Sequence, residues 1–154
     1  MSRRRKRLWF YGGFTALVML MIFCFSAQDG TDSGSLSNWF STTPVGRLIM
    51  GLLPPMTGEG SGADLRKFAH MTEFALLAFF SFHYLRALIM RSKDLFIILC
   101  TFLFCFFYAC TDEFHQIFVP GRVGCFRDVL IDCAGSGFCL ILLWLFFRLR
   151  KDRI

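Results

Sequence analysis

The sequence predicts an all-α integral membrane protein, a four-helix bundle with an additional outward-facing helical segment at the membrane interface. Two observations predict this class. Of the 154 residues, 55% are hydrophobic and only 18% are charged, whereas soluble domains have about 45–50% apolar and about 25% charged residues. In addition, four long apolar runs are each close to the roughly 20 residues that a helix needs to cross about 30 Å of hydrocarbon. Lipid is therefore the expected solvent for most of the surface.

The four expected spans occupy residues 8–26, 67–86, 94–112 and 128–147. The first and third are built on uninterrupted apolar runs. The second carries His70, Glu73 and His83, and the fourth carries Asp132. Both are still expected to span the membrane, because apolar runs of this length would otherwise be exposed to water. The basic start of the first run also fits a cleaved signal peptide. The run is longer than the usual apolar region of about 7–15 residues, so a retained helix is favoured.

Basic residues predict the orientation. Lys and Arg are concentrated in the tails, residues 1–7 and 148–154, and in the connection between the second and third spans. Cytoplasmic loops carry an excess of Lys and Arg, so we expect a multi-pass protein of the cell membrane with both termini in the cytoplasm. Attraction of these ends to anionic lipid accounts for the formal net charge of +6, and no nucleic acid partner is expected.

The long outward segment between the first two spans contains a second kind of helix signal. Apolar residues in the range 36–53 recur at spacings of three and four, which is typical of an amphipathic helix lying in the membrane interface. Pro44 disfavours helical backbone at the residue before it. The helix is therefore expected to break near residues 42–45.

Polar residues gather at the outer ends of three spans. They are Arg66, Lys67, His70 and Glu73 in the second span, Asp112, Glu113, His115 and Gln116 in the third, and Asp128 and Asp132 in the fourth. A charged residue within a span usually faces the bundle interior, so we expect mutual pairing. The expected pairs are Lys67 or Arg66 with Asp128 or Asp132, Arg122 with Glu113 or Asp112, and His70 and Glu73 with His115.

This polar cluster has two interpretations. It is either polar contact that only holds the bundle together, or a pocket open to the outer face, where buried histidines and carboxylates support chemistry. In the second interpretation the catalytic candidates are His70, Glu73, Glu113 and His115. The substrate-binding candidates are Lys67, Asp112, Gln116, Arg122, Asp128 and Asp132.

Two chemistries fit these residue types. One is acid–base catalysis on a lipid-linked or phosphate-bearing substrate, with the basic side chains holding the phosphate. The other is metal binding by imidazole and carboxylate ligands, although the spacing matches no zinc motif. The sequence assigns no metal, cofactor or oligomeric state.

Two local motifs predict backbone features of the site. Pro120 followed by Gly121 favours a type II turn, which would fix Arg122 near the end of the third span. Gly135 and Gly137 in the fourth span predict close contact with another helix.

Four segments together resemble the VanZ-like family of bacterial membrane proteins. They are FSAQ at residues 25–28, RKFAHMTEF at 66–74, TDEFHQIFVPGR at 111–122 and RDVLIDCAG at 127–135. The one departure is Phe74, where the family pattern leads us to expect Tyr. The resemblance spans about residues 8–147. It implies a cellular role, because the family's namesake is associated with low-level resistance to the lipoglycopeptide teicoplanin, but it does not supply a reaction.

Two hypotheses about function therefore remain. In the first, the protein modifies a lipid or other envelope component of the outer leaflet, and this modification affects teicoplanin resistance. In the second, it is a non-catalytic membrane protein that binds lipid, antibiotic or an envelope partner.

Overall fold

The structure is a computed structural model that describes residues 2–28, 30–52, 61–89 and 93–151. Within these ranges every regular element is an α-helix, which confirms the all-α prediction. The helices are α1 (Arg3–Ser26), α2 (Gly30–Thr42), α3 (Pro44–Leu52), α4 (Ser61–Leu88), α5 (Asp94–Gln116) and α6 (Phe126–Lys151).

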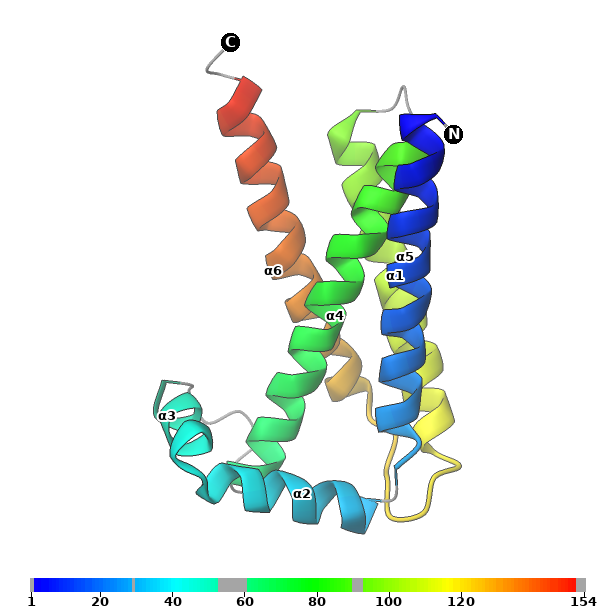
Figure 1. Cartoon of the computed structure of the whole chain (residues 1–154). Coiled ribbons are helices and arrows are strands. Elements are labelled where there is room, and N and C mark those ends of the chain that lie inside the picture. Colours follow the sequence, from blue (N-terminus) through cyan, green and yellow to red (C-terminus); the bar gives the residue numbers. More distant parts are fainter. Residues whose placement is uncertain (1, 29, 53–60, 90–92, 152–154) are drawn as a thin grey trace.

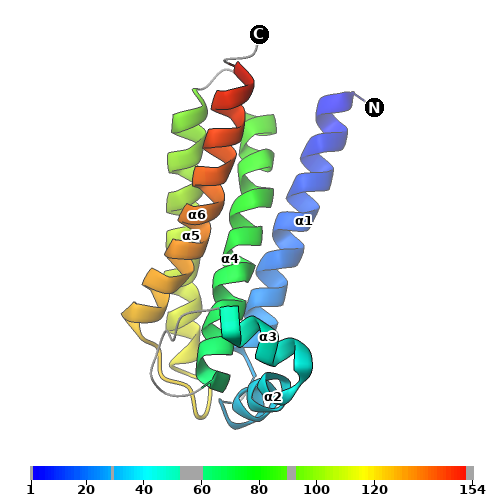
Figure 2. The ribbon, with the colours of Figure 1, turned by 90° about the vertical axis from the view of Figure 1, so that its left-hand side faces the viewer.

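Four long helices, α1, α4, α5 and α6, lie side by side and alternate in direction along the chain (Figures 1 and 2). Helix α4 packs against each of the other three. The two termini lie at the same end of this bundle, and α2 runs across the opposite end, where it packs against α4 (Figure 1). The polar ends of α4, α5 and α6 that the sequence singled out therefore lie at the end that α2 crosses.

The bundle has an apolar interior and an apolar exterior. Phe74, Leu77 and Ile22 are fully buried in the core, whereas Leu95 is 68% exposed and Phe107 63% exposed. An exposed apolar surface of this extent marks contact with a membrane or a partner. By length and composition, α1, α5 and residues Phe126–Leu149 of α6 can each cross a membrane. The crossing by the more polar α4 stays a prediction.

The segment between α1 and α4 is interrupted where the sequence predicts a break. Helix α2 ends at Thr42, and α3 begins at Pro44, a residue whose missing N–H and fixed φ suit the first helical position. The Thr43 hydroxyl caps α3 by accepting a hydrogen bond from the Gly46 N–H at 3.1 Å, as is typical of an N-cap threonine. Helix α2 starts earlier than the apolar pattern predicted, and residue 53 lies outside the described residues.

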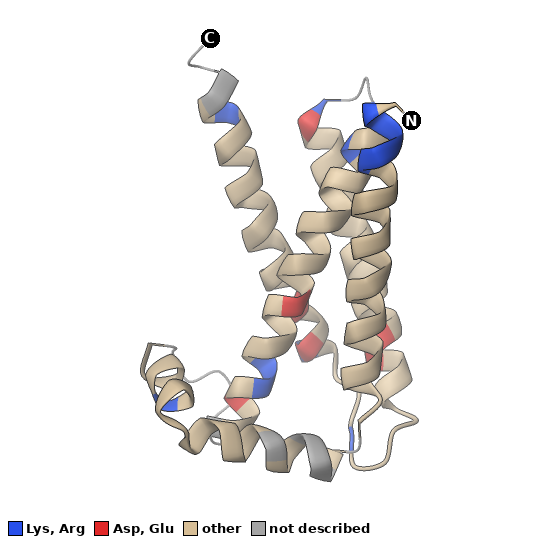
Figure 3. Cartoon of the chain, viewed as in Figure 1, with Lys and Arg blue, Asp and Glu red and all other residues tan. Residues whose placement is uncertain are grey.

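The basic ends are helical rather than separate tails. Helix α1 begins at Arg3, with the Ser2 hydroxyl accepting a hydrogen bond from the Arg5 N–H at 3.3 Å. Helix α6 continues to Lys151, and residues 152–154 of the predicted tail lie outside the described range. In Figure 3 basic residues gather at the start of α1, and most acidic residues lie in the lower half of the bundle.

Candidate functional site

The candidate site is a cavity of about 370 Å³ between the loop that joins α5 to α6 and the ends of α4, α5 and α6 that lie opposite the termini. Its charged and polar lining residues are Arg66, Lys67, His70, Glu113, Gln116, Arg122, Arg127, Asp128 and Asp132. Most of the predicted site residues are thus brought together. Arg66 and Arg127 complete the basic side of the cavity. The sequence counts Arg127 among the basic side chains expected to hold a phosphate, whereas it assigns Arg66 only a pairing role with Asp128 or Asp132.

An ion pair connects α4 to α6 at this cavity. Lys67 Nζ lies 2.7 Å from Asp128 Oδ1, and the two side chains are 13% and 28% exposed. This is one of the pairs that the sequence predicts. Gly135 explains how the two helices come so close, because a Cβ there would lie 2.1 Å from the Met71 carbonyl oxygen. The same approach allows the Ser136 hydroxyl to donate to the Phe74 carbonyl at 3.3 Å.

A buried hydrogen-bond network connects the end of α1 to α5. The Ser26 hydroxyl donates to Asp112 Oδ2 at 2.8 Å. Gln116 Nε2 donates to the same oxygen at 3.0 Å and approaches the Ser26 hydroxyl at 3.4 Å. Asp112 therefore joins two helices, and it is not among the residues that line the cavity. The sequence analysis missed Ser26 as a site residue, since its only signal is membership of the FSAQ segment.

Glu113 anchors the loop between α5 and α6. Its Oε1 accepts a hydrogen bond from Gln116 Nε2 at 3.2 Å, and its Oε2 accepts one from the Cys125 main-chain N–H at 2.8 Å. Cys125 immediately precedes α6. The carboxylate therefore fixes the start of α6 against the end of α5, as well as facing the cavity.

Arg122 caps the end of α1. Gly121 has φ of 70° and the Arg122 N–H donates to the Val119 carbonyl at 3.1 Å, which confirms the predicted turn with glycine at its third position. The guanidinium donates to the carbonyl oxygens of Phe25 at 3.0 Å and Gln28 at 3.1 Å. The sequence predicted Glu113 or Asp112 as the partner of Arg122 and did not predict these main-chain contacts. The oxygens at the end of a helix attract a cation because they have no partner within the helix and carry partial negative charge.

His70 lies between this cavity and a second one. The second cavity, of about 350 Å³, is bounded by α1, α2 and α4 and is largely apolar, with Phe25, Phe40 and Leu65 in its lining. His70, Arg66 and Arg122 line both cavities. His70 Nδ1 lies 3.8 Å from Glu73 Oε2, and within the described residues that oxygen has no hydrogen-bond partner.

A family model described as VanZ/LLP1 matches residues 11–148. The chain belongs to the VanZ/LLP1 family. The match covers α1 to α6 nearly completely and confirms the resemblance drawn from the four sequence segments. Comparisons with curated proteins and with solved structures find no match.

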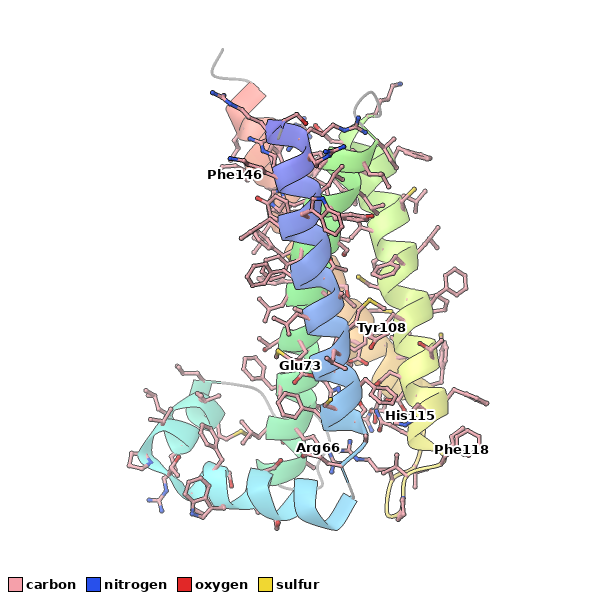
Figure 4. All side chains as sticks on the ribbon, turned by 45° about the vertical axis from the view of Figure 1, so that its right-hand side comes forward. Arg66, Glu73, Tyr108, His115, Phe118 and Phe146 are labelled. Carbon is pink, nitrogen blue, oxygen red and sulfur yellow. The ribbon has the colours of Figure 1, made fainter. Side chains whose placement is uncertain are left out.

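One predicted catalytic residue of this VanZ/LLP1 chain lies apart from the others. The His115 ring stacks on Phe23 of α1, with centroids 4.5 Å apart and an interplanar angle of 29°. It belongs to the lining of neither cavity. In Figure 4, His115 lies against α1, whereas Arg66 and Glu73 lie along α4. The sequence predicted that His115 would lie close to His70 and Glu73; its described ring contact is with Phe23 of α1 instead.

The geometry of the VanZ/LLP1 site bears on the metal hypothesis too. Among the described residues, no group of three or more His, Cys, Asp or Glu side chains is arranged to hold a metal ion. Glu113 is held by hydrogen bonds from Cys125 and Gln116, and His115 stacks on α1. The arrangement is better suited to holding an anion between Arg66, Lys67 and Arg127 and to proton transfer at His70.

Proposed function

We propose that this VanZ/LLP1 protein binds the anionic head group of a lipid-linked component of the bacterial outer leaflet and modifies that component, which lowers susceptibility to teicoplanin. The observation that carries this proposal is the cavity in which basic side chains, carboxylates and His70 converge. Its volume of about 370 Å³ falls within the range of about 300–1,000 Å³ typical of ligand pockets.

The charges of the cavity favour a phosphate-bearing head group. Arg66, Lys67, Arg122 and Arg127 all line it, and Arg and Lys are the usual partners of phosphate. The apolar cavity on the other side of His70 supplies a surface for the lipid part of the same molecule. Membrane-embedded ionisable residues commonly mark functional sites because burying them is costly.

The proposed chemistry is acid–base catalysis by His70, with Glu73 orienting the imidazole. His70 borders both cavities, and Glu73 lies 3.8 Å away. Lys67, Arg122, Asp128 and Asp132 hold the head group or position the residues that do, while Asp112, Glu113 and Gln116 maintain the shape of the cavity. His115 has a packing role in this assignment.

The orientation is part of the proposal. Four crossings, by α1, α4, α5 and α6, leave both termini in the cytoplasm and the cavity at the outer face. Two observations support this: the basic start of α1 and the shared end of the two termini in Figure 1. Cytoplasmic loops of membrane proteins generally carry an excess of Lys and Arg.

A specific observation favours a second candidate, a non-catalytic protein that binds lipid, antibiotic or an envelope partner. Asp112 and Glu113 already accept hydrogen bonds from Ser26, Gln116 and the Cys125 N–H. Carboxylates that are occupied in this way shape a binding surface without taking part in chemistry.

Teicoplanin susceptibility in a sensitive Gram-positive host tests the proposal. The host expresses wild type, His70→Gln, Lys67→Gln, Arg47→Gln or no protein, with vancomycin as the tail-less comparison and membrane levels measured by immunoblot. Arg47→Gln is the matched control, because Arg47 is exposed on α3 and its loss removes the same charge outside the cavity. We expect wild type and Arg47→Gln to raise teicoplanin tolerance selectively, and the other two variants to fail.

The possible failures have different meanings. Wild type without effect despite good expression would contradict the teicoplanin role. Full protection by Lys67→Gln would contradict the head-group cavity. Full protection by His70→Gln with loss in Lys67→Gln would favour the non-catalytic binder, because removing a general acid or base typically costs about 10²–10⁴-fold in rate.

A further inference from the structure

A second polar cavity lies at the end of the bundle that carries the termini. It has a volume of about 580 Å³. Its lining consists of Arg3, Arg4, Arg7 and Tyr11 from α1, His83, Arg86 and Ala87 from α4, and Phe147 from α6. Among the described residues, four arginines and no acidic side chain line it. It lies at the opposite end of the bundle from the candidate site, and Figure 3 shows the basic start of α1 at this end.

Two of the four arginines fix the wall of this cavity. Arg4 donates from Nε to the Ala87 carbonyl and from Nη2 to the Leu88 carbonyl, both at 3.1 Å, and so caps the end of α4. The Arg86 guanidinium lies 3.9 Å from the centroid of the Phe147 ring and pairs with Asp94 at 3.5 Å. These contacts tie α1, α5 and α6 to the end of α4 and leave the cavity preformed.

The other two arginines supply uncompensated charge. In the described part of the chain, no acidic side chain forms an ion pair with Arg3 or Arg7. A cavity with preformed walls and two such guanidinium groups suits a phosphate, whose oxygens accept the paired N–H donors of arginine.

Stacked aromatic rings extend from this cavity along the bundle. Tyr11 stacks on His83 with centroids 4.9 Å apart, and one turn further on Phe14 stacks on Phe80 at 5.0 Å. Phe14 is 38% exposed. A molecule with its phosphate among the arginines would therefore find an apolar surface directly beside it, which is the arrangement of head group and acyl chain in a phospholipid.

We propose that the cavity lined by Arg3, Arg7, Arg86 and Tyr11 is a binding site for the phosphate group of an anionic phospholipid, separate from the candidate functional site. A free phosphate ion has the same oxygen acceptors as the phosphate of a phospholipid, so the same guanidinium groups would bind either one. The aromatic surface beside the cavity is what favours the lipid.

Two double variants distinguish lipid binding in this cavity from attraction of lipid by the overall positive charge of the helix end. Arg3→Gln with Arg7→Gln removes two positive charges from the cavity. Arg5→Gln with Lys6→Gln removes two from the same helix end, but neither residue lines this cavity. Arg4 and Arg86 are left intact because they hold α4 in place. Purified full-length protein in detergent is mixed with phosphatidylglycerol or phosphatidylcholine, and lipid retention is measured by native mass spectrometry, with inorganic phosphate as a competitor.

We expect wild type to retain phosphatidylglycerol in preference to phosphatidylcholine. The first double variant should lose this retention by about tenfold, since each basic residue near a membrane surface contributes substantially to anionic lipid binding, whereas the second should change it less than about twofold. Equal losses of phosphatidylglycerol retention in the two double variants would overturn the proposal, because overall charge would then explain the binding. Equal retention of both lipids by wild type, without binding of inorganic phosphate, would also overturn it. Complete displacement by inorganic phosphate would support the anion site and assign it to free phosphate. Equal thermal unfolding midpoints for both variants exclude misfolding as the cause of a difference.

Discussion

Replacement of Gly135 by Ala is expected to force α4 and α6 apart at the candidate site. A Cβ on Gly135 would lie 2.1 Å from the Met71 carbonyl oxygen and 2.8 Å from Met71 Cγ. Carbon and oxygen normally approach no closer than about 3.3 Å, so the two helix backbones must separate by about 1 Å. Gly137 is the matched control, because its added Cβ would lie 3.7 Å from Phe102 Cε2, an ordinary contact.

The magnitude follows from comparing these two variants. Both gain the same helix propensity, up to about 1 kcal/mol, so this contribution cancels between them. Forcing extra atoms into a packed contact costs about 1–3 kcal/mol. Gly135→Ala should therefore be less stable than Gly137→Ala by about 1–3 kcal/mol. The separation should also weaken the ion pair between Lys67 and Asp128, which lies further along the same two helices.

Thermal unfolding in detergent, followed by circular dichroism, measures this difference. A protein of this size shifts its midpoint by about 2–4 °C per kcal/mol, so Gly135→Ala should unfold several degrees below Gly137→Ala. Equal midpoints would refute the close approach at Met71. The ion pair gives a second readout: Lys67→Met should destabilise wild type more than it destabilises Gly135→Ala.

Three further predictions concern the buried network, the turn and the orientation. Ser26→Ala should lower the free energy of unfolding by about 1–2 kcal/mol by removing a donor from a buried carboxylate, whereas Ser81→Ala should change it less, since the Ser81 hydroxyl donates to the Leu77 main-chain carbonyl of its own helix; equal effects would argue against the network. Gly121→Ala should cost about 1–2 kcal/mol because its φ of 70° is unfavourable for a residue with a Cβ, measured in the same assay, and an unchanged midpoint would contradict the turn. In a cysteine-free background, an impermeant thiol reagent should label Val45→Cys in intact cells but label Arg148→Cys only after permeabilisation; the reverse result would invert the proposed topology.

The sequence predicts which residues gather at the site better than it predicts their partners. Charged residues within apolar spans must face the interior, so the outer ends of α4, α5 and α6 could be expected to converge, and the pair of Lys67 with Asp128 was among the expected alternatives. Arg122 donates to the main-chain oxygens of Phe25, in α1, and of Gln28, just after it, and the sequence did not predict these contacts. Carbonyl groups have no sequence signature, so such partners cannot be read from residue types.

The way in which α1 packs on α5 explains why His115 does not lie where the sequence predicted. The period of the helix groups His115 with Asp112 and Gln116 on one side of α5, and those two indeed join the network at the end of α1. Which edge of that face meets α1 depends on how α1 and α5 pack, and this places the His115 ring on Phe23. A single sequence specifies the face but not the neighbour that each residue on it will meet.

The hydrogen bonds to Glu113 determine which substitution can distinguish a catalytic role of the site from a binding role. Both of its carboxylate oxygens accept hydrogen bonds, and the one from Cys125 fixes the start of α6. Glu113→Gln would place an amide N–H₂ against a donor, either Gln116 Nε2 or the Cys125 N–H, so it would disturb the loop even if Glu113 had no chemical role. Loss of function in that variant would therefore not demonstrate catalysis. His70 borders both cavities, and its described ion-pair contact is the 3.8 Å approach to Glu73. His70→Gln keeps hydrogen-bonding capacity with less disturbance of the loop, so its effect distinguishes proton transfer from a binding surface more directly.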